Sequence, residues 1–454
     1  MILAAAAVAA IACNKENVEQ TNPAPSDGLV TFTAGFDALG TKTNLAQDEA
    51  KQYTKMVWSA GDVIGVVDKN GKVQPFTTEK GGATAIFKGA AEAPESTWYA
   101  FYPYNEQATV NSVTDPTLDI SIPEVQLAKK DGVSDNVTTL VGNCSVEGNS
   151  IMFTHVCGFV RINAPEGCVS VTLELPEANE GITGGVGTKF YKYGTYSTKI
   201  RYRSVTLVSQ EGMAAGNYYI AVKPIKYTGK VRITMHHKDG RVFVKEASGL
   251  SVGAGEVLPV NITGFSWSED KEINLFTGAE SDKFSTLDGP YQCSITKVSD
   301  EKLIASESIR WAFTEEITSA WAGFVGFRGQ IDLSDYANDY ALEYYIKCNL
   351  PAVTTCGVDD QLYTHQFNDK NDRTEYRIMS HRYPSNTFKG LGDTGWHRIS
   401  IPLCDILNGI SGTTVSHIQM KPYASANAVE QIQSYKGAEF YINNLRIVRI
   451  TPTE

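Results

Sequence analysis

The chain has 454 residues, of which 42% are hydrophobic and 20% charged, and its formal net charge is −11. The composition is that of an ordinary globular protein, and the length exceeds what one core organises, so we expect several domains. The negative charge disfavours nucleic acid as a partner, because a phosphate backbone would be repelled. After residue 13, no apolar run approaches the length of a membrane-spanning helix.

An alanine-rich apolar segment opens the chain and ends at a cysteine. Residues 1–12 are too short to span a bilayer as a helix and are typical of a signal peptide. No Lys or Arg precedes the run, which fits a signal peptide that starts further upstream. The string Ala10-Ile11-Ala12-Cys13 resembles the lipobox of bacterial lipoproteins, which implies that Cys13 carries a diacylglycerol and fatty acyl chains such as palmitate. A chance cysteine after a generic apolar segment is the alternative.

The segment after Cys13 is polar. Residues 14–19, Asn-Lys-Glu-Asn-Val-Glu, resemble the short tag that directs lipoproteins of Bacteroidota to the outer face of the outer membrane. Residues 14–28 contain two prolines and no aromatic residue, so this segment cannot bury apolar surface. We therefore expect a lipidated flexible tether over residues 13–28. The outer membrane is then a partner through the lipid, and the protein is exposed at the cell surface.

Alternation with a period of two dominates the rest of the chain. Residues 30–36 and 231–235 alternate apolar and polar side chains, and pairs such as Asn70-Gly71 form turns between such runs. Long helical periodicity is nearly absent. The pattern predicts an all-β protein, with sandwiches favoured over closed barrels.

Two breaks in the pattern suggest domain boundaries. One is Ala164-Pro165-Glu166-Gly167, and the other is the polar stretch around residues 266–271. We expect two β-sandwich domains, a linker and a C-terminal domain, at residues 29–164, 165–265, 266–271 and 272–454.

Four short strings in the N-terminal half resemble elements of the fimbrillin family of Bacteroidota. They are Trp58-Ser59-Ala60-Gly61-Asp62 with the apolar run after it, Trp98 to Tyr104, Ile122 to Gln126, and Phe153-Thr154-His155 followed by Val160-Arg161-Ile162. The resemblance implies two β-sandwich domains, with other fimbrial subunits as partners. Maturation in that family follows cleavage after an arginine near the first strands, whereas the first arginine here is Arg161. The resemblance therefore favours an anchor, tip or solitary surface protein over a major pilus subunit.

Two of these strings carry a structural expectation. The Gly61-Asp62 turn lets Trp58 fold back as a plug of the core. His155 has no nearby cluster of Cys, Asp or Glu, so we interpret it as a hydrogen-bonded core histidine and not as a ligand or base.

The C-terminal block has a different signature. The strings Ile273 to Gly278, Trp396 to Leu403 and Phe440 to Ile447 resemble the galactose-binding-like jelly roll of carbohydrate-binding modules. The resemblance implies a jelly roll that binds polysaccharide or host glycan. Asn443 stands where an Asp is common, which disfavours a structural calcium site there, and no other cofactor is expected.

This block is also rich in aromatic residues, and sugars bind through their apolar faces on aromatic rings while polar side chains hold the hydroxyls. The segment from Tyr363 to Tyr383 alternates both kinds of side chain. The candidate glycan-binding residues are Trp321, Gln366, Arg373, Tyr376 and Arg377. The alternative for any single aromatic residue is a place in the jelly-roll core.

The remaining cysteines and motifs do not indicate catalysis. Besides Cys13 there are seven cysteines without CxxC spacing, which favours buried thiols over zinc or redox chemistry, with a Cys348–Cys356 bridge as a weaker alternative. No nucleophile elbow, P-loop, dinucleotide fingerprint or HExxH motif occurs, so we expect a non-enzyme. The first hypothesis is a fimbrillin-type surface lipoprotein in adhesion or an accessory pilus role. The alternative is a surface lipoprotein that captures glycan through its C-terminal jelly roll.

Overall fold

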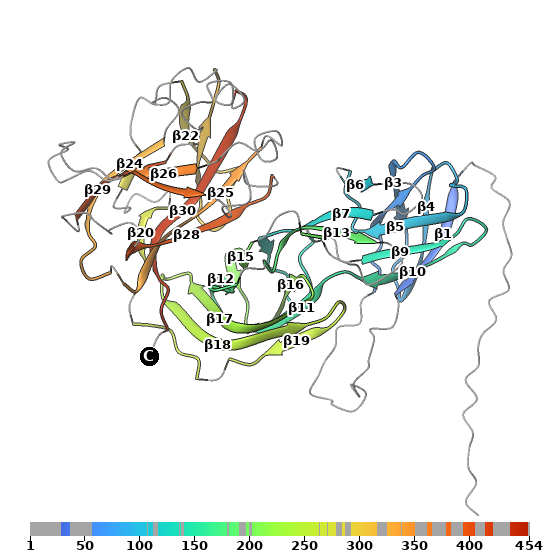
Figure 1. Ribbon diagram of the computed structural model, residues 1–454, viewed down its shortest axis with the longest axis horizontal. Coiled ribbons are helices and arrows are strands. Elements are labelled where there is room, and N and C mark those ends of the chain that lie inside the picture. The colour runs from blue at the N-terminus through green and yellow to red at the C-terminus, as the bar shows by residue number, and fades with distance from the viewer. Residues whose placement is uncertain are drawn as a thin grey trace, which may run out of the picture.

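The computed structural model describes residues 29–452 with short breaks and with longer gaps at 37–56, 112–116, 190–196, 278–283, 287–291, 316–324, 350–360, 366–377, 383–393, 405–413 and 421–435. The elements in this part of the chain are strands, so the predicted all-β class is confirmed. Three units follow one another, with the second between the first and the C-terminal unit (Figure 1). Among the described residues, no helix has the length and hydropathy that a membrane crossing requires. Residues 1–28, including Cys13, lie outside the described part.

Seven strands of the first unit close into a barrel, although the sequence pattern favoured open sandwiches. In spatial order they are β1 (Val30–Phe36), β10 (Ser150–His155), β9 (Leu140–Ser145), β5 (Thr97–Tyr102), β2 (Val63–Val67), β3 (Val73–Thr78) and β4 (Thr84–Gly89). The barrel closes because β1 pairs on both of its edges, antiparallel to β4 and parallel to β10. Closure leaves no free sheet edge, and the pairings that produce it join segments far apart in sequence.

Trp58 plugs this barrel as the sequence predicted. Its side chain is 2% exposed, its indole Nε1–H donates to the carbonyl of Ala34 at 3.0 Å, and its ring packs against Phe36, Phe87 and Phe153. The turn that returns the chain requires a positive φ of 89° at Gly61, which glycine adopts without steric cost.

The second unit is a sandwich of two sheets. One sheet contains β18 (Val242–Val252), β17 (Ile225–His237), β12 (Cys168–Glu174), β15 (Ser204–Met213) and β8 (Val125–Leu127); the other contains β16 (Gly216–Val222), β11 (Gly158–Ala164) and β19 (Val257–Val260). Residues of both sheets share one apolar core. The strands β8 and β11 precede the expected boundary at residue 164, yet they pair with β15, β16 and β19. The hydrogen-bonded sheets therefore cross that boundary.

Gln126 shows how the segment before residue 164 is held. Its buried amide donates to the carbonyl of Ala221 at 2.8 Å and accepts from the Ala221 N–H at 3.0 Å. A small sheet of β6 (Thr109–Asn111), β7 (Thr117–Ile122), β13 (Gly184–Lys189) and β14 (Ser197–Thr198) adds a further connection. Leu118 and Ile122 join one apolar cluster with Phe101 of the barrel and Phe159 of the second unit. The first two units thus share packed side chains.

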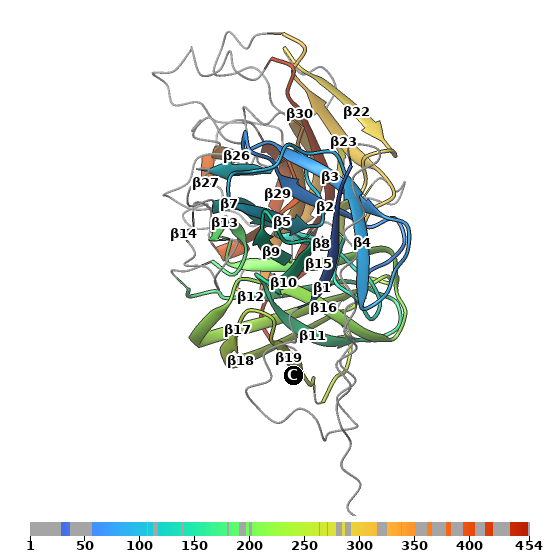
Figure 2. The same ribbon diagram turned by 90° about the vertical axis from the view of Figure 1, so that its right-hand side faces the viewer.

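The C-terminal unit has two layers. One layer contains β22 (Ser294–Val298), β23 (Ser308–Ala312), β30 (Glu439–Arg449), β25 (Tyr340–Cys348) and β28 (His397–Pro402), with β20 (Ile273–Phe276) also on β30; the other contains β21 (Phe284–Thr286), β24 (Val325–Asp332), β29 (Thr414–Met420), β26 (Gln361–His365) and β27 (Ile378–Arg382). From the end of the first unit, β22, β23 and β30 lie on one side and β26 and β27 on the other (Figure 2).

The stretch expected as a linker is attached to the second unit. Ser268 pairs with Val242 through both its backbone N–H and its side-chain oxygen, and the Trp267 ring lies 5.0 Å from the ring of His237. The N–H of Glu272 donates to the carbonyl of Gly240 at 2.8 Å. The chain therefore enters the C-terminal unit along the β17–β18 hairpin.

Candidate functional site

The predicted glycan-binding residues fall outside the described part of the chain, but their neighbours are placed. Trp321 precedes β24, and the other four, Gln366, Arg373, Tyr376 and Arg377, belong to the segment that joins β26 to β27. β26 and β27 are antiparallel partners, and β27 is the last strand of the five-stranded sheet. Four of the five candidates thus belong to one short stretch of sequence between these two strands. Their roles stay predictions.

Many other aromatic residues of this unit form its core, which was the stated alternative. Trp311, Phe313, Phe327, Tyr340, Tyr344 and Tyr345 are all buried. The first three join one apolar cluster with Tyr344 between the two layers. These rings shape the domain and do not offer a face to a sugar.

Asn443 has a structural role in place of the carboxylate that is common at its position. Its side-chain oxygen accepts from the N–H groups of Ile304 and Ala305 at 3.1 and 3.0 Å, and its amide donates to Glu307 O and Ser308 Oγ at 3.0 Å each. The residue is fully buried, and the four bonds pin residues 304–308 to β30. No group of three or more His, Cys, Asp or Glu side chains within the described residues is arranged to hold a metal ion.

The outer face of the six-stranded sheet meets the second unit through buried charges. Glu343 on β25 accepts from Arg398 Nε at 2.7 Å and from Arg446 Nη2 at 2.6 Å. Arg446 Nη1 also donates to Glu272 at 2.7 Å, and that carboxylate lies 3.0 Å from Nδ1 of His236 on β17. Glu343 and Arg446 are fully buried.

The charges in this network set each other's protonation. Burial alone would raise the pKa of Glu343, but the guanidinium groups of Arg398 and Arg446 outweigh this effect and lower it to about 2. Burial, and then the charge of Arg446, lower the pKa of His236. Both groups therefore have charge states fixed at neutral pH, an ionised carboxylate and a neutral imidazole.

A smaller contact completes this junction. Ser204 Oγ donates to Glu124 at 2.6 Å, the other Glu124 oxygen lies 3.5 Å from Nδ1 of His397, and Tyr345 packs with Val125 and Val208. In the described contacts, the junction uses the six-stranded sheet and not the sheet that carries β26 and β27. The strands β26 and β27, which flank the predicted glycan-binding segment in the sequence, belong to the other sheet.

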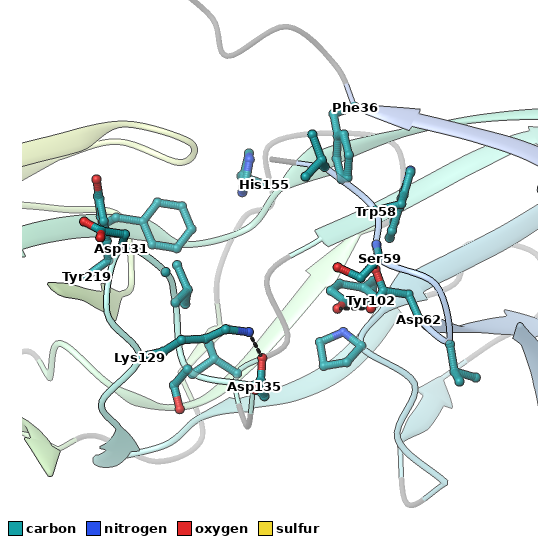
Figure 3. Close-up of a pocket in the computed structure, with 18 of the residues that line it drawn as sticks. Phe36, Trp58, Ser59, Asp62, Tyr102, Lys129, Asp131, Asp135, His155 and Tyr219 are labelled. Atoms are coloured by element: carbon teal, nitrogen blue, oxygen red, sulfur yellow. Dashed lines mark hydrogen bonds and ion pairs between the residues drawn. The ribbon is translucent and has the colours of Figure 1, made fainter. Parts of the chain in front are cut away.

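A cleft lies at the other junction, where the barrel mouth faces the second unit. The strands β1, β5 and β10 end there at Phe36, Tyr102 and His155, and the opposite bank is formed by the loop from Lys129 to Val137 with Tyr219 and Val257. The cavity volume is about 700 Å³. Figure 3 shows Trp58, Asp62 and Tyr102 on one bank and Lys129, Asp131 and Asp135 on the other.

Polar groups in this cleft are held in place. The Tyr102 hydroxyl donates to Asp62 at 3.0 Å, and the other Asp62 oxygen accepts from the Ser59 N–H at 2.7 Å. Lys129 pairs with Asp135 at 2.6 Å across the opposite bank. This cleft was not predicted, although Trp58, Tyr102 and His155 belong to strings noted in the sequence, because their meeting point depends on long-range strand pairing.

His155 is buried as predicted, but the expected hydrogen bond is not observed at Nδ1. The side chain is 9% exposed, its ring meets Phe159 edge-on at 5.4 Å, and the buried Nδ1 has no partner among the described residues. Burial lowers the pKa of His155 to about 4, so the ring is neutral at physiological pH.

The predicted burial of cysteines holds for Cys157, Cys168 and Cys348. Burial raises the pKa of Cys157 and of Cys168 to about 12 each, so both are thiols at neutral pH. Cys356 lies outside the described residues, so the alternative bridge stays a prediction.

Comparison with known proteins gives one family. Residues 264–449 match the model of the family described as carbohydrate binding domain 30. This match covers the C-terminal unit, where the sequence resembles carbohydrate-binding modules. Among curated proteins, no match was found. The fimbrillin resemblance of the N-terminal half stays a prediction.

Several solved structures are similar at low identity. The family 30 carbohydrate-binding module of a cellulosomal cellulase of Clostridium thermocellum is 13% identical, with 39% of this chain and 97% of that chain covered and a TM-score of 0.27. A candidate cell adhesion protein from Bacteroides uniformis is 14% identical, with 62% and 98% covered and a TM-score of 0.30. A CBM22 tandem domain from Paenibacillus barcinonensis is 12% identical, with 86% and 98% covered and a TM-score of 0.24.

Proposed function

We propose that this protein binds glycan, without catalysing its cleavage, through the unit that contains residues 264–449. The family match over these residues carries the proposal. The sequence adds support, since four of the five candidate residues lie in the stretch that joins β26 to β27.

The binding residues we propose are Tyr376 and Trp321 for stacking and Gln366, Arg373 and Arg377 for the hydroxyls. Aromatic rings recognise the apolar face of a sugar, and forked or amide side chains reach two neighbouring hydroxyls at once. Four of these five residues are close together in the sequence, which suits recognition of neighbouring units of a chain-like ligand.

We further propose that Cys13 carries a lipid and that the protein is exposed on the outer membrane. The lipobox-like string and the polar tether over residues 13–28 support this proposal. Labelling with an acyl-chain probe should mark the wild-type protein and leave Cys13→Ala unmarked. Continued labelling of the variant would contradict the site.

A fimbrillin-type role in adhesion, as an accessory pilus subunit, is the second candidate. The ordered strings around Trp58, Tyr102 and Gln126 support it, because each has a defined place in the barrel or at its junction. Presence of the protein in purified fimbriae, with no glycan bound, would favour this candidate over the first.

Glycan binding is tested with the full chain from residue 14. On a glycan array, the wild-type protein should bind a restricted set of glycans, and Tyr376→Ala should weaken binding roughly fivefold or more, as expected for the loss of one stacked ring. Arg373→Ala should also weaken it, while Arg203→Ala, an exposed arginine of the second unit, should not. A blank array would contradict the proposal, and unfolding of Tyr376→Ala would place that ring in the core.

A further inference from the structure

The cleft at the barrel mouth has the features of a ligand site that the proposed function does not use. Its volume of about 700 Å³ lies within the range of small-molecule sites, ~300–1,000 Å³. The mouths of β-barrels are frequent binding positions, because the closed sheet holds the ends of several strands around one space. Here Phe36, Tyr102 and His155 are those strand ends.

The lining combines ring faces with groups that both donate and accept hydrogen bonds. Phe36, Tyr102 and Tyr104 are partly exposed and line the cleft. The Tyr102 hydroxyl donates its hydrogen bond to Asp62. The lone pairs of the Tyr102 oxygen can therefore accept a hydrogen bond from a ligand. The ion pair of Lys129 and Asp135 is more than half exposed and offers charged groups to ligand hydroxyls.

His155 provides the observation that points to a ligand. It is nine-tenths buried, its Nδ1 has no partner among the described residues, and it lines the cleft from the end of β10. Leaving a buried polar atom without a partner is unfavourable, and a ligand in the cleft would supply the missing hydrogen bond. Because the imidazole is neutral, one ring nitrogen donates and the other accepts.

Charge narrows the class of ligand. Among the described residues, the charged side chains that line the cleft are Asp62, Asp131, Asp135 and Lys129, three acidic groups and one basic group. Phosphate or sulfate groups would be repelled, and a purely apolar ligand would leave these polar groups without water or partners. A neutral ligand with an apolar ring face and several hydroxyls fits both constraints.

We propose that the barrel-mouth cleft is a second binding site, specific for a short neutral saccharide. Phe36, Tyr102 and Tyr104 supply ring faces, while His155, Asp62 and the Lys129–Asp135 pair recognise hydroxyls. This site is independent of the C-terminal unit, and Figure 3 shows that its two banks come from different units.

The first test blocks the cleft. Val57 lines it and is 56% exposed, so Val57→Trp should fill space in the cleft without disturbing a core. Ile86→Trp is the matched control, because Ile86 is 55% exposed on the same barrel and does not line the cleft. Calorimetric titration of the full chain uses short cello-, xylo-, manno- and galacto-oligosaccharides, with a heparin disaccharide as the anionic probe.

The expected result is binding of at least one neutral oligosaccharide, lowered roughly tenfold or more by Val57→Trp and unchanged by Ile86→Trp, with no binding of the heparin disaccharide. Equal saccharide affinity of Val57→Trp and Ile86→Trp would show that saccharide does not bind in the cleft. This result would overturn the second site and leave the function proposed for residues 264–449 intact. Absence of binding by any neutral probe, or preference for heparin, would also overturn it. A change of oligomeric state in Val57→Trp without glycan binding would assign the cleft to protein docking instead.

The second test removes the polar atoms of His155. His155→Phe keeps a ring against Phe159 and deletes the buried nitrogens, so at neutral pH the melting temperature should stay equal or rise. Saccharide affinity should fall roughly tenfold, as expected for one or two lost hydrogen bonds. Unchanged affinity, or a lowered melting temperature, would show that His155 stabilises the fold and does not bind a ligand. Either result would overturn its assigned role.

Discussion

The second unit meets its two neighbours in different ways. Toward the barrel it shares an apolar cluster and encloses an open cleft of about 700 Å³. Toward the C-terminal unit it encloses a network in which Glu343, Arg398 and Arg446 are buried and paired at 2.6–2.7 Å. The first junction leaves an open space, whereas the second buries charged side chains.

The two junctions therefore suit different roles, one in orienting a neighbouring unit and the other in binding a ligand. Burying ion pairs costs much desolvation energy, so such a network adds little net stability compared with apolar packing. Any other arrangement would leave these charges buried and unpaired, so we expect the network to favour one orientation of the C-terminal unit. The barrel junction instead leaves an open cleft lined by aromatic and polar side chains, which suits a site that takes up a ligand.

The largest effect is expected for a substitution that disrupts the charged junction. Glu343→Ala leaves Arg398 and Arg446 buried without their carboxylate, so the free energy of unfolding should fall by about 3–5 kcal/mol. Urea unfolding followed by tryptophan fluorescence measures this loss. Glu92→Ala, which removes an exposed partner of Lys69, should show no measurable change. Equal behaviour of the two variants would mean that the buried charges do not hold the junction.

The pH dependence of the free energy of unfolding should show an effect of similar size at the barrel junction. The folded-state pKa of His155 is about 4, below its ordinary 6.5, so between these values the unfolded chain binds a proton that the folded chain does not. Stability should therefore fall as the pH drops from 6.5 toward 4, and the gap corresponds to ~3 kcal/mol in full. His155→Phe should remove this share of the pH dependence, measured by urea unfolding at several pH values.

The charged junction supplies the remaining acid sensitivity. His236, whose pKa is lowered by burial and by Arg446, contributes in the same direction below 6.5. Glu343 contributes only as the pH falls from 4.5 toward about 2, where its carboxylate gains a proton. If the curves of wild type and His155→Phe were parallel from pH 7 to 4, the low pKa of His155 would be wrong.

The smallest effect concerns the amide that ties β8 to β16. Gln126→Ala leaves the buried N–H and C=O of Ala221 without their side-chain partner, which should cost about 1–3 kcal/mol. Thermal unfolding measures this loss. Gln74→Ala, which removes a partly exposed bond to Asp68, should cost less. A larger loss for Gln74→Ala would contradict the structural role given to Gln126.

Local patterns in the sequence determined the strands, the Trp58 plug and the burial of His155. These features depend on side chains within a few residues, such as the period of two and the Gly61-Asp62 turn, so they can be read without knowing the partners. The C-terminal strings resembling carbohydrate-binding modules also agree with the family matched there. The roles of Trp321, Gln366, Arg373, Tyr376 and Arg377 rest on composition within one segment and stay predictions.

Only the tertiary structure decided which strands pair and what their pairing brings together. β11 joins β16 and β19 across the expected boundary, β1 closes the barrel through two partners, and Glu343 meets Arg446 and Arg398 between units. The barrel-mouth cleft likewise unites Asp62, Tyr102 and His155 from separate strands or turns. Each of these contacts depends on the register between distant segments, and a one-residue change of register turns every side chain to the opposite face. Periodicity within a strand defines its two faces, but the partner that covers each face is set by the whole chain.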